Sequence, residues 1–198
     1  MKRGVFLLCA FLMSVSIANA NFIVVNDNII SPKASVKIES LGKELYLKTK
    51  VNVYVAATKS LDNVTIKEYE KSLVPTLKKP FVILALAKDA QKVDIMNSRA
   101  LDDKFDKEST LSPFPWSGTI IPLLSAKKAH DKYNAALLNG YADIVEQIAS
   151  SYNVKLEGSI GNTNKSIYQY LQIGIYGFLL IVLGRYFYQY IRRKNDKN

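Results

Sequence analysis

The chain has 198 residues, a formal net charge of +10, 48% hydrophobic residues and one cysteine. The basic excess lies mainly at the two ends, because residues 21–158 hold 19 basic and 16 acidic residues. This balance argues against the basic patch of a nucleic-acid-binding protein, so we expect no nucleic acid among the partners.

The first 20 residues have the pattern of a secretory signal peptide. Lys2 and Arg3 precede an apolar stretch, and Ala18-Asn19-Ala20 supplies the small residues of a cleavage site. We therefore predict a signal peptide over residues 1–20. Its removal takes away Cys9, so the mature chain is expected to have no disulfide, thiol nucleophile or thiolate metal site.

Residues 21–157 are predicted to form one exported α/β domain. Ser31-Pro32 is a helix start, residues 51–57 form a β-rich apolar run, and Thr65 with Glu68 forms a capping box for a second helix. Residues 81–87 predict a second buried strand, and a polar turn leads from it to a third strand around residues 93–95. A crossover through the second helix makes the first two strands parallel, and a hairpin follows.

The second half of the domain begins with a long segment that lacks periodicity, residues 99–118. Such a loop is often functional. Apolar residues at helical spacing then predict a long amphipathic helix over residues 126–151. Together these elements predict a three-layer α/β/α domain with helices covering a mixed sheet.

The C-terminal part is predicted to anchor the chain in a membrane. A polar linker at residues 158–166 precedes an uncharged run at 167–184. As a helix this run would span roughly 27 Å, close to the ~30 Å thickness of the hydrocarbon core of a membrane. We predict a transmembrane helix over residues 167–190 and a basic cytoplasmic tail over 191–198, following the positive-inside rule. Within the helix, Gln172, Gly174 and Gly177 are candidates for contacts with a neighbouring helix.

An acidic cluster follows the predicted hairpin. Asp102, Asp103 and Asp106 are close enough in sequence to share a divalent cation or to supply an acid and a base. The competing interpretation, which we prefer, is a solvated loop in which Lys104 and Lys107 balance the charge. Because His130 is the only histidine, a histidine-based metal site is not expected. We thus assign no catalytic residue and no required cofactor.

A short aromatic motif, Pro113-Phe114-Pro115-Trp116, is the candidate site for a partner. Aromatic side chains held by prolines form rigid anchors of the kind found at binding hot spots. The alternative is that Phe114 and Trp116 fill the domain core. The sequence leaves both interpretations open.

The order of these motifs resembles the TPM domain family over about residues 22–150. The resemblance is carried by residues 25–27 before the Ser-Pro helix start, the runs at 51–55, 66–69 and 81–89, and then 121–124, 131–133 and Gly140. It implies a membrane-tethered exported protein, and family members include factors for membrane-complex repair as well as phosphatases or metal binders. Here the turn at residues 97–100 lacks the glycines that are common in the family.

From these observations we expect a single-pass protein of the inner (cytoplasmic) membrane, with its domain in the periplasm and its C-terminus in the cytoplasm. We expect it to act as a chaperone-like assembly or stability factor for an inner-membrane protein complex, such as a respiratory complex or a flagellar motor stator. The alternatives are an exported acid phosphatase or hydrolase that uses the Asp-rich loop, and a permanent accessory subunit of a membrane complex. The anchor would also contact membrane lipid.

Overall fold

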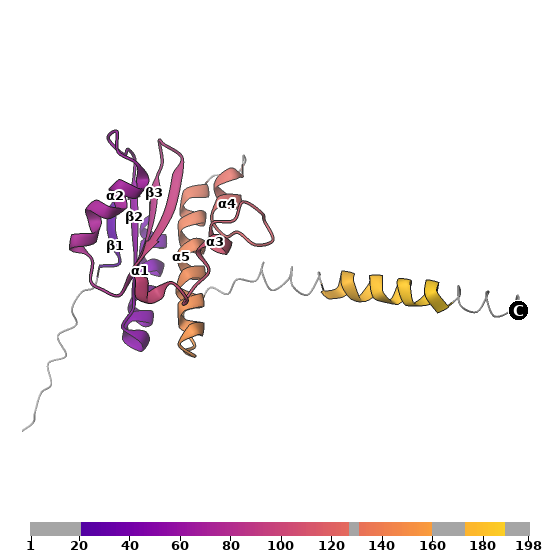
Figure 1. The fold of residues 1–198 in the computed structure, drawn as a ribbon. Helices are drawn as coiled ribbons and strands as arrows, with labels where there is room; N and C mark the ends of the chain where they lie inside the picture. Colours follow the sequence, from indigo (N-terminus) through magenta and orange to yellow (C-terminus); the bar gives the residue numbers. More distant parts are fainter. Residues whose placement is uncertain (1–20, 127–130, 160–172, 189–198) are drawn as a thin grey trace, which may run out of the picture.

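The computed structural model describes residues 21–126, 131–159 and 173–188. Residues 21–126 and 131–159 form a mixed α/β domain around a four-stranded sheet (Figure 1). The strands are β1 (Ile23–Asn26), β2 (Asn52–Thr58), β3 (Phe81–Ala87) and β4 (Lys92–Asn97), and they lie side by side in that order. The predicted signal peptide falls outside the described residues.

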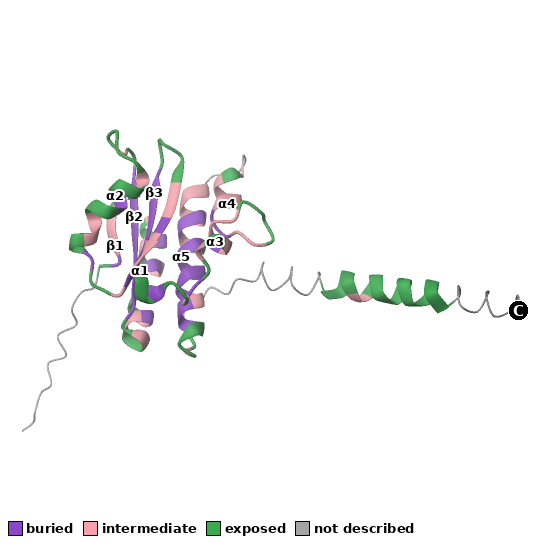
Figure 2. Cartoon of the chain, in the orientation of Figure 1, coloured by how far each residue is buried: buried purple, intermediate pink, exposed green. Residues whose placement is uncertain are grey.

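The sheet is mixed, as the sequence predicted. β1, β2 and β3 are parallel, with Asn52 opposite Phe81, and β4 runs antiparallel to β3. Every residue of β2 and β3 is buried (Figure 2), because both faces of these central strands are covered. β1 was not predicted; its four residues are too few to show a periodicity of their own.

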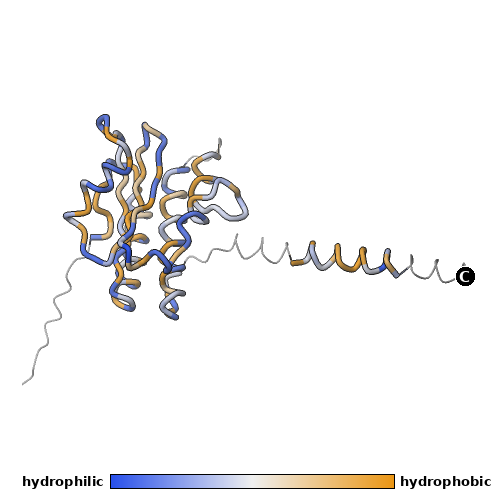
Figure 3. The backbone as a smooth tube through the Cα atoms, in the orientation of Figure 1, coloured by the Kyte–Doolittle hydropathy of each residue, from blue (hydrophilic) through white to orange (hydrophobic). Residues whose placement is uncertain are grey.

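Helices cover both faces of the sheet and form the predicted three layers. α1 (Pro32–Thr49) and α5 (Lys132–Ser151) pack together on one face, where Val53, Val55 and Leu84 point. α2 (Ile66–Leu73) covers the other face near β3 and β4. The hydropathy colouring in Figure 3 follows this arrangement, with apolar strands at the centre of the domain.

The helix starts follow their sequence signals. Ser31 caps α1 by accepting a hydrogen bond from the Ala34 nitrogen, and Pro32 occupies the first helical position. Thr65 and Glu68 form the predicted capping box of α2. These local interactions fix where both helices begin.

A buried tyrosine joins the α5 layer to the sheet. The hydroxyl of Tyr141 donates a hydrogen bond to the Val53 carbonyl at 2.9 Å, and Tyr141 is fully buried. Gly42 of α1 and Gly140 of α5 allow this packing, because an added Cβ would overlap Phe22 at Gly42 and Ile120 at Gly140. Small residues at these positions therefore let the two helices approach the core closely.

The segment between β4 and α5 contains more structure than the sequence indicated. It holds a 3-10 turn at Arg99–Leu101 and two short α-helices, α3 (Lys107–Thr110) and α4 (Ile121–Ser125). The predicted helix over 126–151 is described from Lys132, and residues 127–130, which include His130, lie outside the described part. Pro122 places a separate short helix before α5, because proline is favoured in the first turn of a helix.

Residues 173–188 are helical, and the hydrophobic side chains among them are largely exposed to solvent. In the described ranges, no helix is both long enough and apolar enough to cross a membrane. The rest of the predicted anchor over 167–190, the linker beyond Ser159 and the tail over 191–198 fall outside the described residues.

Candidate functional site

The aromatic motif lies on a closed surface loop between α3 and α4. The backbone nitrogens of Ser117 and Gly118 both donate to the Phe114 carbonyl, at 3.1 and 2.7 Å. The Ser117 hydroxyl is 2.6 Å from that of Ser112, and the Thr119 nitrogen returns to the Thr110 carbonyl. An added Cβ on Gly118 would overlap the Ser112 carbonyl, so this tight closure depends on glycine there.

Phe114 and Trp116 project from this loop into solvent. Their side chains are 53% and 58% exposed, and their rings stack with centroids 4.9 Å apart and an interplanar angle of 17°. Neither ring fills the core, so the core-filling interpretation of the motif is excluded, and binding of a partner by these rings stays a prediction. Two stacked aromatic rings on a closed loop form a preformed apolar surface.

A buried polar network connects the base of the aromatic loop to α5. Asp143 is 5% exposed, and its Oδ2 accepts hydrogen bonds from the hydroxyls of Thr110 (3.1 Å) and Thr119 (3.0 Å). Gln147 donates to the Thr110 hydroxyl and accepts from the Asp106 nitrogen. Asp143 and Gln147 were not predicted from the sequence; the available signal was an aspartate on the apolar face of a predicted amphipathic helix.

The three predicted aspartates each have a local partner. Asp102 accepts a hydrogen bond from the Asn97 amide at 2.8 Å, Asp103 pairs with Lys104 at 3.0 Å, and Asp106 caps α3 through the Ser109 nitrogen at 2.8 Å. The hydrogen bond from Lys104 lowers the pKa of the Asp103 carboxyl. The three carboxylates are therefore engaged separately in the structure.

The same aspartates nevertheless line one open hollow of about 950 Å³ against α5, together with Glu108, Asp143 and Glu146. Among the side chains of residues 21–126, 131–159 and 173–188, no three histidine, cysteine or acidic residues are grouped closely enough to hold a metal ion. The arrangement offers an acidic surface, and a cation shared by Asp102, Asp103 and Asp106 stays the untested alternative to the preferred solvated loop.

Two further carboxylates have defined environments. Asp27, directly after β1, accepts hydrogen bonds from the Lys59 nitrogen and the Thr58 hydroxyl, and these lower its pKa. Glu70 on α2 is fully buried, and neither of its carboxylate oxygens has a hydrogen-bond partner in the described part of the chain. Burial, with Asp94 nearby, raises the pKa of Glu70 to about 8.

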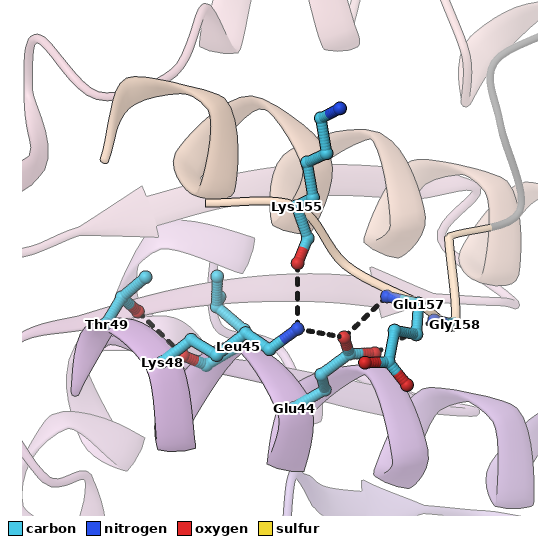
Figure 4. Close-up of polar contacts among 7 residues, drawn as sticks. All are labelled: Glu44, Leu45, Lys48, Thr49, Lys155, Glu157 and Gly158. Carbon is cyan, nitrogen blue, oxygen red and sulfur yellow. Dashed lines mark hydrogen bonds and ion pairs between the residues drawn. The ribbon is translucent and has the colours of Figure 1, made fainter. Parts of the chain in front are cut away.

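The end of the domain is fixed onto α1 by a set of polar contacts (Figure 4). Glu44 accepts hydrogen bonds from the backbone nitrogens of Glu157 (2.6 Å) and Gly158 (2.9 Å). Lys48 pairs with Glu44 at 2.8 Å and donates to the Lys155 carbonyl at 2.8 Å. We call these contacts the exit clamp, because they hold residues 155–158, near the end of the domain, on α1.

The predicted helix-contact residues lie apart from the domain in sequence. A Cβ on Gly174 or Gly177 would meet no atom within 4 Å, so both positions present open space. Gln172 lies outside the described residues. Their proposed contacts with a neighbouring helix stay a prediction.

The chain matches a known domain family and resembles solved domains in its fold. The family model described as TPM domain matches residues 23–147. The N-terminal domain of the cg2496 protein from Corynebacterium glutamicum is similar, with 15% identity and a TM-score of 0.51, over 72% of this chain and 84% of that one. The N-terminal domain of a protein from P. gingivalis has 12% identity and a TM-score of 0.57, over 70% of this chain and 88% of that one. No curated protein matches the sequence significantly.

Proposed function

The chain belongs to the TPM domain family, matched over residues 23–147, and from this premise we propose that it is a membrane-tethered periplasmic factor that assists the assembly or stability of an inner-membrane protein complex. The observation that carries the proposal is the exposed stack of Phe114 and Trp116. Exposed aromatic pairs with a rigid backbone are favourable anchors, because little conformational entropy is lost when they bind.

Tethering supports this role by raising the local concentration of the domain. The uncharged run at 167–184 and the basic residues after it favour a single anchor with its tail in the cytoplasm. The exit clamp holds the chain up to Gly158 on α1, so only the residues beyond it can act as a free tether. A short tether keeps a binding loop within reach of neighbouring membrane proteins.

The direct test places a photo-crosslinking residue at position 116 in the full chain in cells. We expect crosslinks to one or a few subunits of a membrane complex, and lower steady-state levels of that complex when the gene is deleted. The matched control carries the same residue at Val36, which is 71% exposed on α1. Equal crosslinking from both positions, or unchanged levels of every membrane complex after deletion, would defeat the proposal.

Stoichiometry distinguishes an assembly factor from a permanent accessory subunit. We expect the protein to be recovered with its partner in less than equimolar amount after detergent extraction, because an assembly factor dissociates from the finished complex. Co-purification in a fixed ratio with the mature complex would identify it as a subunit.

A second candidate function is hydrolysis of an exported phosphate ester. It is favoured by the way Asp102, Asp103 and Asp106 line one hollow with Asp143 and Glu146, since paired carboxylates can act as acid and base or hold a cation. The full chain in detergent should then hydrolyse a phosphate monoester. Activity that survives replacement of all three loop aspartates by alanine would exclude this site.

A further inference from the structure

A separate pocket lies where β3 ends, on the side of the domain formed by α4 and the first turn of α5. Its volume is about 390 Å³, within the size range of small-molecule sites. The last two residues of β3 and the first two of β4 contribute to it. The carboxyl ends of parallel strands are where open α/β folds usually bind ligands, because loops and helix N-termini meet there.

Part of the pocket lining is apolar. Leu86 and Val93 reach it from the β3–β4 hairpin, and Ile121 and Leu124 reach it from α4. Leu86 is buried, and the other three are partly buried. Such a lining favours a ligand with an apolar body, because binding removes apolar surface from water.

The polar part of the lining is cationic. Lys92 and Lys132 both line the pocket, beside Gln91 and Ser125, and no acidic residue does. Neither lysine forms an ion pair with a carboxylate in the described part of the chain. Their charges are therefore available to an anion, in contrast to the acidic hollow beside Asp102 and Asp106.

Tyr133 brings a third lysine to the same place. The ammonium of Lys132 lies 5.2 Å from the centre of the Tyr133 ring, and that of Lys88 lies 5.6 Å from it. These cation–π contacts hold both ammonium groups near the pocket. Lys132 and Tyr133 also begin α5, a helix of 20 residues, whose N-terminal dipole end adds positive potential.

We propose that this pocket binds a small amphipathic anion, a soluble molecule with a carboxylate or phosphate-type group on a short apolar body. The anion is held by Lys92 and Lys132, with Lys88 adding positive charge through Tyr133. The apolar body lies against Leu86, Val93, Ile121 and Leu124. This site is distinct from the aromatic loop and from the aspartate hollow.

Calorimetric titration of the full chain in a non-ionic detergent tests the class of ligand. The probes are phenylphosphonate, inorganic phosphate and benzyl alcohol. We expect phenylphosphonate to bind, phosphate to bind at least about tenfold more weakly because it lacks the apolar body, and benzyl alcohol not to bind. Absence of phenylphosphonate binding, or benzyl alcohol binding as tightly, would overturn the proposal.

Paired variants test the location. Lys92→Gln with Lys132→Gln should weaken phenylphosphonate binding by about tenfold or more, because both charges that line the pocket are removed. The control, Lys43→Gln with Lys71→Gln, removes two exposed lysines from α1 and α2 and should leave the affinity unchanged. Equal weakening by both pairs would mean that the anion responds only to net charge, and the pocket assignment would be wrong.

Discussion

The Glu44 carboxylate accepts a hydrogen bond from the backbone nitrogen of Gly158 at 2.9 Å, although the two residues are 114 positions apart in the sequence. A second bond, from the Glu157 nitrogen at 2.6 Å, makes this a two-point attachment. Glu157 and Gly158 are thus part of the folded surface of the domain.

Replacing Glu44 by alanine should release this segment from α1. Hydrogen bonds to a charged acceptor contribute about 1.5–3 kcal/mol each, so the Glu157 and Gly158 amides should exchange with deuterium at least about tenfold faster. Hydrogen-exchange mass spectrometry of the full chain measures this. Lys43→Ala, at an exposed neighbouring position, serves as the control; unchanged protection in the Glu44 variant would show that the clamp is not formed in solution.

The clamp should also depend on pH. Burial alone would raise the pKa of Glu44, but hydrogen bonds from Lys48, Glu157 and Gly158 together lower it below its ordinary value of 4.5. A lowered folded-state pKa means that the stabilisation is present above pH 4.5 and is lost as the pH falls through the folded pKa. The protection of the Gly158 amide, which is its intrinsic exchange rate divided by the observed rate, should therefore fall in acid in the wild type and not in Glu44→Ala.

Removal of both loop aromatics should leave the domain stable. Because Phe114 and Trp116 are more than half exposed, the double alanine variant should change the free energy of unfolding by less than about 1 kcal/mol. Phe105→Ala, at a position that is 9% exposed, should cost about 3–5 kcal/mol. Chemical denaturation measures both. A large loss in the double variant would mean that the rings support the core.

Glu70 should make the domain less stable as the pH rises. Its folded pKa of about 8 lies above the ordinary value of 4.5, so the folded state holds a proton that the unfolded state loses between these values. The contribution of Glu70 to the free energy of unfolding is fully present below pH 4.5. It is lost progressively up to pH 8, by up to about 4 kcal/mol. Melting temperatures measured from pH 5 to 8 should fall in the wild type.

Glu70→Gln should remove most of this slope, because the amide does not titrate. The control is Glu108→Gln, at an exposed position, which should keep the wild-type profile. If wild type and Glu70→Gln lose stability equally between pH 5 and 8, the slope has another origin.

Gly42 should not tolerate a side chain. A Cβ there would lie 2.6 Å from Phe22 Cγ and would also overlap the Tyr141 hydroxyl, and both of these residues are fully buried. Gly42→Ala should therefore destabilise the domain by roughly 1–3 kcal/mol, despite the higher helix propensity of alanine. Ser40→Ala, exposed on the same helix, should be neutral or slightly stabilising, and the same result for Gly42→Ala would contradict the packing described.

Local patterns were sufficient to predict β2, β3 and the starts of α1 and α2. Ser31-Pro32 and the Thr65–Glu68 capping box act within one helical turn, and the apolar runs of β2 and β3 are long enough to identify buried strands. The order of these motifs also identified the TPM domain family, which the match over residues 23–147 confirms. β1 was missed because four residues carry too little pattern.

The tertiary structure decided what distant residues do together. The composition of the Phe114–Trp116 motif fitted a core position as well as an exposed one, since burial depends on what else covers the rings. The burial of Glu70, the exit clamp at Glu44 and the placing of Lys88 over Tyr133 each depend on elements far apart in the chain. Sequence periodicity reports only neighbours along one element, whereas desolvation and charge pairing are set by the packing of several elements.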